Sequence, residues 1–330
     1  MIDLLPSMLF DSVMGKPVWM WGAFITLVLA LLALDLGVMH RKNSVIGVRE
    51  SLVMSGFYIA IAMLFGGWVW WAQGAENGAA FFTGFLIEKT LALDNIFVIS
   101  LIFGYLAIPR EYQHRVLLWG ILGVIVLRAI MIGLGAALVA EFSWVLLIFA
   151  AFLVYTGIKM LCVKEADPDI ANNPLLKFLR RKLRVTDTLH GERFFVRLQG
   201  STGKTQTYVT PLLIALVLVE VADVVFAVDS VPAIFAITTD PYIVYTSNIF
   251  AILGLRALYF ALAAIIHKFH HLKTAMALVL IFIGGKVFAA DLMGIDKVPP
   301  SISLGVTVLL LAGGVVASLL LPQKKDTPAV

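Results

Sequence analysis

The chain has 330 residues, of which 61% are hydrophobic and only 14% are charged, whereas about a quarter of the residues of a soluble domain are charged. This composition excludes an ordinary soluble protein. The formal net charge of +4 comes from loops on one side of the predicted helices, so we assign it to a surface that faces anionic lipid and not to a nucleic-acid surface. Cys162 is the single cysteine, which excludes an intrachain disulfide and a CxxC redox or zinc motif.

Apolar segments of roughly 20 residues recur along the chain, each long enough to cross a bilayer core. Backbone groups in lipid must be hydrogen-bonded within the segment, so each one is predicted to be a helix. The short alternating segments of a transmembrane barrel are not seen in the sequence. The nine predicted helices cover 18–39, 49–71, 80–106, 113–138, 143–162, 209–236, 243–266, 272–291 and 300–321. The predicted fold class is an all-α polytopic membrane protein.

Basic residues predict the orientation of these helices. Eighteen lysines and arginines lie after the odd-numbered predicted helices, and only Lys16 and Lys297 lie in the opposite loops. By the positive-inside rule the N-terminus is outside and the C-terminus is cytoplasmic. The first residues have no basic n-region and no clear cleavage site, so the helix 18–39 is expected to remain as an anchor.

The long segment 163–208 is the one substantial part outside the predicted helices. It begins with an acidic stretch at 165–169 and continues with a short basic amphipathic helix between Leu175 and Arg184. Two short runs that flank Gly200-Ser-Thr-Gly203 predict a small hairpin. We favour a connector that lies on the membrane surface and is held by anionic headgroups. The alternatives are a gate or a docking site for a membrane or cytoplasmic protein partner.

A motif with two buried acids occurs twice. Residues 88–95 (EKTLALDN) return in altered form at 223–230 (DVVFAVDS), each time with two carboxylates six residues apart. Leu-Arg-Ala follows at 127–129 and again at 255–257, and then come Gly157-Ile-Lys159 and Gly284-Gly-Lys286. The order of these markers predicts two repeats, 80–162 and 209–291, flanked by the helices 18–39, 49–71 and 300–321. Because each repeat has three helices, the two copies run in opposite directions, an arrangement that places a transport site near the membrane midplane.

The charged residues inside the predicted helices form the candidate site. Each such acid costs roughly 2.5–3.5 kcal/mol to insert, and the four basic partners are Lys89, Arg128, Arg256 and Lys286. The five acids, Glu88, Asp94, Glu220, Asp223 and Asp229, outnumber the four bases, which leaves a net negative charge. The structural alternative is that these residues form ion pairs that only fix the register of the helices. Asp35, in the first helix, has either a role in the ion path or a structural one. The predicted metal ligands are Glu88, Asp94, Asn95, Glu220, Asp223, Asp229, Ser230 and Asn248.

These ligands are all oxygen donors, which suit Mg²⁺, Ca²⁺ or Mn²⁺ and disfavour Zn²⁺ or Cu⁺. Two acids six residues apart on a regular helix are separated by about 120° and about 9 Å, so they cannot hold one ion from an unbroken helix. Pro232 is predicted to break the sixth helix and to free the Val228 carbonyl as a ligand. Lys89 and Lys286 are hypothesised to be tethered counter-ions that replace the cation in the empty site.

At these motifs the chain resembles the TerC family, in particular its Alx-like members, and it is similar to the LysE-type transporter group. The matching stretches are FTGFLIEKTLALDNIFV at 82–98, FAVDSVPAIFAITTDP at 226–241 and SNIFAILGLRA at 247–257. The resemblance implies a multi-pass protein of a bacterial inner (plasma) membrane and Mn²⁺ export. From the residues alone, a hard-cation site is all that follows.

We therefore predict a transporter, not an enzyme, that exports Mn²⁺ in exchange for protons, with no organic cofactor. Asp94 and Asp229 are the predicted central ligands, and Glu88, Asp223 and Glu220 are ligands or proton acceptors. The alternative is a non-transporting membrane protein that acts in tellurite resistance, redox modulation or metalation of exported enzymes.

Overall fold

The computed structural model describes residues 11–39, 47–162, 170–199, 205–262, 270–294 and 298–320. The long helices are α2 (Val18–Met39), α3 (Val48–Gln73), α4 (Ala75–Tyr105), α5 (Arg110–Glu141), α6 (Val145–Cys162), α8 (Pro211–Phe235), α9 (Pro241–Ile252), α11 (His270–Met293) and α12 (Pro300–Leu320). The short elements are α7 (Pro174–Lys182), α10 (Leu255–Leu262), and the strands β1 (Ser12–Val13), β2 (Lys16–Pro17), β3 (Phe195–Gln199) and β4 (Thr205–Val209).

The polytopic all-α fold is confirmed. Eight helical segments of the described chain are long and apolar enough to cross a membrane, and α9 and α10 together form one of them. The third predicted helix corresponds to α4, which has 31 residues and carries the charged side chains of Glu88, Lys89 and Asp94 near its middle. Over its described residues, each of the nine predicted segments lies mainly on helix; the segment 243–266 is divided between α9 and α10, and its residues 263–266 lie outside the described part of the chain.

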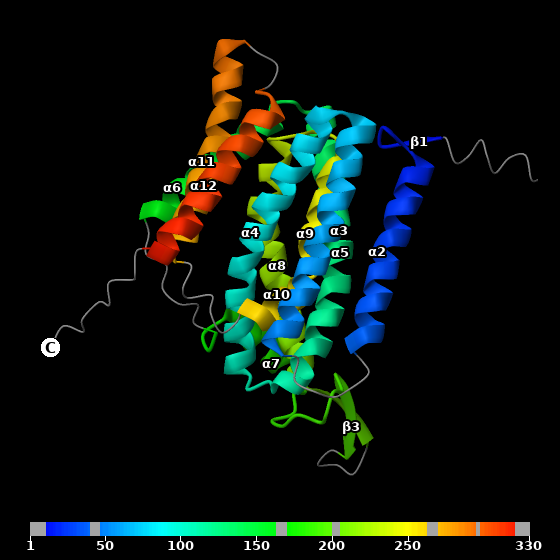
Figure 1. The fold of residues 1–330 in the computed structure, drawn as a ribbon. Coiled ribbons are helices and arrows are strands. Elements are labelled where there is room, and N and C mark those ends of the chain that lie inside the picture. Colours follow the sequence, from blue (N-terminus) through cyan, green and yellow to red (C-terminus); the bar gives the residue numbers. More distant parts are fainter. Residues whose placement is uncertain are drawn as a thin grey trace, which may run out of the picture.

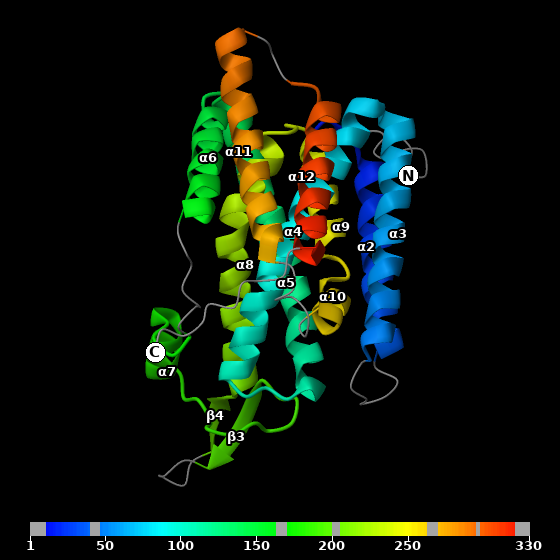
Figure 2. The ribbon, with the colours of Figure 1, turned by 60° about the vertical axis from the view of Figure 1, so that its left-hand side comes forward.

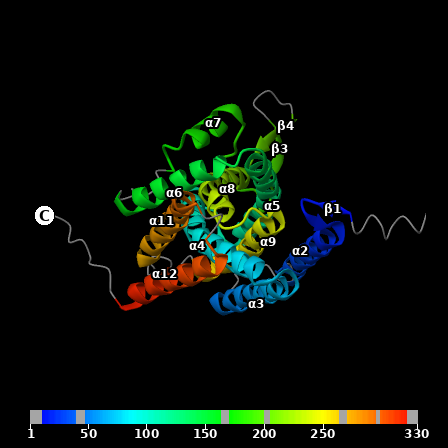
Figure 3. The ribbon, with the colours of Figure 1, turned by 90° about the horizontal axis from the view of Figure 1, so that it is seen from above.

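The helices form a bundle with a central group and two flanks (Figures 1 and 3). In the centre, α4 packs against α8 and α9, and α5 packs against α8. On one flank α6 pairs with α11, which also contacts α12, and on the other α3 lies against α4 and α10. The two predicted repeats thus contact each other through α6 with α11, through α4 with α9 and through α5 with α8. The inverted repeat itself stays a prediction.

Small residues allow α6 and α11 to meet closely. A Cβ atom at Gly157 of α6 would lie 2.7 Å from the carbonyl oxygen of Ala277, and a Cβ at Gly284 of α11 would lie 2.6 Å from that of Ala150. Both distances are too short for any side chain, so each helix presents a glycine to the backbone of the other. The two glycines that mark the predicted repeats have the same packing role.

The segment between α6 and α8 contains the predicted amphipathic helix and hairpin. Helix α7 begins at Pro174. The preceding residue, Asn173, is its N-cap, and the Asn173 side chain accepts hydrogen bonds from two backbone N–H groups of the first turn. Strands β3 and β4 pair antiparallel, with Phe195 opposite Val209. Figure 2 shows α7 and the hairpin at one end of the bundle, called here the α7 end. The acidic stretch 165–169 and the turn 200–203 lie outside the described residues. The short pair β1–β2 was not predicted.

The broken membrane segment is not the predicted one. Helix α8 runs without interruption to Phe235, and Pro232 lies in its last turn, where the lost N–H disturbs only the end of the helix. Val228 is 47% exposed, so its side chain lies on the outside of α8, and the use of its carbonyl as a ligand stays a prediction. The break lies instead between α9 and α10, at Gly254, whose φ of +79° favours glycine.

Candidate functional site

Arg128 is the centre of the charged cluster in the interior of the bundle. It lies in the middle of α5 with only 1% of its surface exposed. A guanidinium has five N–H donors and no acceptor, so a buried arginine needs several oxygen partners. The neighbouring helices α4, α8 and α9 supply them.

The partners of Arg128 are predicted metal ligands from both predicted repeats. Its Nη2 lies 2.8 Å from Glu88 Oε1 of α4, and its Nε lies 3.3 Å from Asp223 Oδ2 of α8. Its Nη1 donates to Ser230 Oγ at 2.7 Å and to Asn248 Oδ1 of α9 at 2.6 Å. The guanidinium thus occupies the place among these oxygens where the sequence predicts a metal ion.

Asn95 extends the cluster along α4. Its Nδ2 donates to Asp223 Oδ1 at 3.0 Å, so the Asp223 carboxylate accepts from both Arg128 and Asn95. Asp223 and Asn95 are both less than a tenth exposed. Hydrogen bonds inside a low-dielectric interior are strong when they are complete, and partly unsatisfied clusters are correspondingly costly.

Several oxygens of the cluster are buried without a hydrogen-bond partner. They are Glu88 Oε2, Asn95 Oδ1 and Glu220 Oε2. Buried polar atoms are normally paired, and an unpaired one calls for a specific explanation. Because all three are acceptors, the groups that would satisfy them are donors or cations.

Glu220 lies on α8 one turn before Asp223, and its carboxylate rests on the backbone of α5. A Cβ atom at Gly123 would lie 2.1 Å from Glu220 Oε1 and 2.5 Å from its Cδ. No residue other than glycine therefore fits at position 123 with Glu220 in this place. This role of Gly123 was not predicted; a glycine inside a membrane helix was the available signal.

A small cavity adjoins the cluster. It has a volume of about 20 Å³, which is enough for a single water molecule. Its polar lining comes from Asn95, Asp223 and Arg256, and the rest is apolar. It lies toward the α7 end, because Ile99 follows Asn95 along α4 in that direction and Val219 precedes Asp223 along α8 (Figure 1).

The two predicted central ligands are placed differently from Glu88 and Asp223. The Asp229 carboxylate accepts from Thr156 Oγ1 of α6 at 3.3 Å, on a different side of α8 from Asp223. Asp94 is only partly buried, whereas its neighbour Asn95 is buried. The unbroken α8 separates Asp223 from Asp229 as regular helix geometry requires. Within the described parts of the chain, no three His, Cys, Asp or Glu side chains are placed to hold a metal ion together.

The other predicted basic partners lie outside the cluster. Lys89 donates to the Ala251 carbonyl at 3.0 Å, near the end of α9 where the helix breaks. Lys286 donates to Ser303 of α12 at 2.7 Å. The Arg256 Nη2 lies 2.6 Å from Asp35 Oδ2. In this structure Arg128 contacts the acids of the cluster, and the hypothesis that Lys89 and Lys286 are tethered counter-ions stays a prediction.

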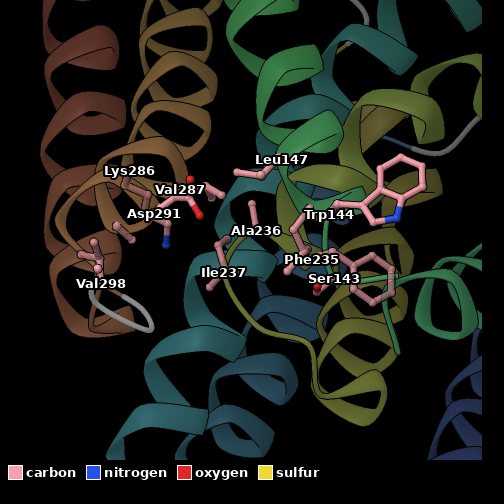
Figure 4. A pocket seen from close by; sticks show the side chains of 13 residues that line it. Ser143, Trp144, Leu147, Phe235, Ala236, Ile237, Lys286, Val287, Asp291 and Val298 are labelled. Carbon is pink, nitrogen blue, oxygen red and sulfur yellow. The ribbon is translucent and has the colours of Figure 1, made fainter. Parts of the chain in front are cut away.

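A second cavity, of about 530 Å³, is separate from this cluster. Figure 4 shows Lys286 and Asp291 of α11 on one side of it, facing Leu147 of α6 and Phe235 at the end of α8. It shares no lining residue with the small cavity, and among the predicted site residues only Lys286 lines it.

Comparisons with known proteins agree with the resemblance seen in the sequence. A sequence model described as "Integral membrane protein TerC family" matches residues 73–326. An "Uncharacterized membrane protein" from Rickettsia bellii is 51% identical over 91% of this chain and 97% of that protein, and "Uncharacterized membrane protein STKORF319" from Myxococcus xanthus is 47% identical over 96% and 97%. The "Putative membrane-bound redox modulator Alx" from Escherichia coli is 44% identical over 91% and 94%. No solved structure matches the chain.

Proposed function

Because the chain belongs to the TerC family of integral membrane proteins, we propose that it is a transporter that exports a divalent metal cation, Mn²⁺, from the cytoplasm in exchange for protons. The cation and protons are substrates, and no organic cofactor takes part. The protein lies in the bacterial inner membrane with the α7 end in the cytoplasm.

The observation that supports this proposal is a buried carboxylate site that is filled by the protein's own cation. Glu88 and Asp223 carry two negative charges, and Arg128 supplies one positive charge between them. Nearby buried oxygens of Glu88, Asn95 and Glu220 have no hydrogen-bond partner. A divalent cation that displaces Arg128 would neutralise both carboxylates and satisfy oxygens that the guanidinium leaves unpaired.

The donor set directs the choice of cation. Carboxylate, amide and hydroxyl oxygens suit Mn²⁺, Mg²⁺ and Ca²⁺. Among these we choose Mn²⁺, because it is the ion whose export the family resemblance implies. The donors that we assign to it are Glu88, Asn95, Asp223, Ser230 and Asn248.

Export requires an energy source. Moving a divalent cation outward against a potential of about 100 mV, negative inside, costs roughly 4.6 kcal/mol at about 2.3 kcal/mol per charge. A passive pore would therefore carry the cation inward. Carboxylates that exchange a metal ion for protons supply the coupling, and Glu220 is our candidate for a proton acceptor beside the metal ligands.

The test is transport by the purified protein in liposomes. We expect Mn²⁺ movement to be accompanied by a proton signal of opposite direction, and we expect Glu88→Gln and Asp223→Asn to abolish both. The matched control is Asp291→Asn, an exposed acid at the far end of α11, which should transport like the wild type. Metal flux without proton movement at a clamped potential would exclude antiport, and no Mn²⁺ flux at all would exclude transport.

The name of the Escherichia coli relative supports a second candidate function. A non-transporting membrane protein that modulates redox state, tellurite resistance or metalation of exported enzymes would act through a partner. The exposed basic side chains of α7, among them Arg180 and Arg181, and the β3–β4 hairpin are the surface available for one. Such a protein would tolerate Glu88→Gln and Asp223→Asn but would lose its effect on cells when residues 170–209 are deleted.

A further inference from the structure

Two arginines in corresponding Leu-Arg-Ala sequences have different acidic partners. Arg128 points into the charged cluster, whereas Arg256, at the start of α10, is bound to α2. Its Nη2 lies 2.6 Å from Asp35 Oδ2 and donates to the backbone oxygen of Asp35 at 3.1 Å. Both side chains are buried, with Arg256 1% and Asp35 5% exposed. Asp35 lies outside the residues 73–326 that match the family.

Arg256 also borders the candidate cation site. It lines the small cavity together with Asn95 and Asp223. The Asp223 carboxylate is negative, and Asn95 Oδ1 is a buried acceptor without a partner. Both groups attract a guanidinium, and arginine has a long side chain that reaches several neighbouring positions. Asp35 supplies two contacts that hold the Arg256 guanidinium against α2.

We infer that Asp35 is a positioning residue, which holds Arg256 against α2 and so keeps a second guanidinium out of the cation site. This inference rests on the proposed function. In this role Asp35 neither binds the cation nor carries a proton. Arg128 is the counter-ion that the cation displaces, and a second arginine at Asp223 would compete with the cation for the same carboxylate.

The experiment compares Asp35→Asn with the double variant Asp35→Asn/Arg256→Gln in proteoliposomes. In the single variant we expect the half-saturating Mn²⁺ concentration to rise about tenfold or more, which corresponds to ~1.4 kcal/mol or more. The maximal rate should be unchanged, because saturating Mn²⁺ displaces the competitor. Removing the competitor in the double variant should restore the half-saturating concentration to within about threefold of the wild type. Asp291→Asn is the matched control and should change neither quantity.

The alternatives give different results. If Asp35 is a ligand or proton carrier, the double variant stays inactive. If the ion pair only stabilises the fold, Asp35→Asn lowers thermal stability and leaves the half-saturating concentration unchanged. Either result overturns the inference.

A structure of Asp35→Asn in a lipid nanodisc tests the inference independently of transport. We expect the Arg256 guanidinium within hydrogen-bond distance of Asp223 or of Asn95 Oδ1. A guanidinium that stays on α2 overturns the inference even if the wild type transports Mn²⁺. If the wild type moves no Mn²⁺, the proposed function fails, and the nanodisc structure alone still decides where Asp35 holds Arg256.

Discussion

Replacing Arg128 by glutamine would leave two carboxylates facing each other inside the membrane. In the wild type the guanidinium contacts Glu88, Asp223, Ser230 and Asn248 at distances between 2.6 and 3.3 Å. Removing one partner of a buried ion pair costs about 3–5 kcal/mol, because the other charge stays buried without compensation. We expect Arg128→Gln to lower the free energy of unfolding by about this amount when no divalent cation is present.

A divalent cation should reverse this loss. A ligand at a hundred times its dissociation constant stabilises a protein by about 2.7 kcal/mol. In the wild type the cation must first displace the guanidinium, which offsets part of this gain. The stabilisation of the wild type by Mn²⁺ is therefore smaller. The variant lacks that competitor. We therefore expect Mn²⁺ to stabilise Arg128→Gln more than the wild type and to bind it more tightly, while transport is lost because no counter-ion refills the site.

The assay is thermal unfolding in detergent with and without MnCl₂, together with Mn²⁺ binding followed by electron paramagnetic resonance. Arg128→Lys keeps the charge but cannot bridge the same partners. Its thermal stability should therefore lie between that of the wild type and that of Arg128→Gln. Arg115→Gln is the matched control: Arg115 pairs with Glu192 at 3.2 Å with both side chains about a third exposed, and such pairs contribute about 0–1 kcal/mol. If Arg128→Gln is as stable as Arg115→Gln without metal, or if Mn²⁺ shifts it no more than the wild type, the counter-ion role of Arg128 is refuted.

Other variants separate the neighbouring groups. Gly123→Ala should displace the Glu220 carboxylate, because a Cβ would lie 2.1 Å from its Oε1. We expect at least a tenfold slower transport, or ~1.4 kcal/mol, and a rate equal to that of the wild type would contradict this role of Gly123. Glu220→Gln should give the same transport defect. Asp229 lies outside the Arg128 cluster, so Asp229→Asn should leave the Mn²⁺ affinity within about threefold of the wild type. Complete loss of Mn²⁺ binding would show that Asp229 is a ligand. Lys89→Met leaves the Ala251 carbonyl without its donor, so thermal stability should fall by about 1–3 kcal/mol without an Mn²⁺-dependent difference.

The architecture could be predicted from the sequence because lipid restricts what an apolar segment can form. Segments of about 20 apolar residues can only be helices in a bilayer, and over the described residues each predicted segment lies mainly on helix. The helix in the loop was predictable for a similar reason: between Leu175 and Arg184 the leucines recur with helical spacing among basic residues, and α7 forms there. The hairpin was indicated by the glycines between its two strands.

Which acids meet could be predicted only in part. Glu88 and Asp223 were expected in one site, and the structure brings both to Arg128. Asp229 was expected beside them, but the choice depends on which side of α8 faces α5 and which faces α6, and packing decides this. The sequence also contained two reasons for a break, a proline and a glycine. Pro232 lies where a helix ends anyway, whereas Gly254 lies in the middle of a membrane segment and has the positive φ that ends α9.

The charges of the site suggest where Arg128 goes when a cation takes its place. A divalent cation neutralises Glu88 and Asp223, and the displaced guanidinium then needs another carboxylate within the membrane. Glu220 is one turn away from Asp223 on α8, it rests on α5, the helix that carries Arg128, and its buried Oε2 has no hydrogen-bond partner. We therefore expect Arg128 to pair with Glu220 in the loaded state. Glu220→Gln should then bind Mn²⁺ more weakly than the wild type but regain affinity when it is combined with Arg128→Gln, since the double variant has no displaced charge to accommodate. Additive effects of the two changes on Mn²⁺ affinity would show that Arg128 and Glu220 do not exchange partners.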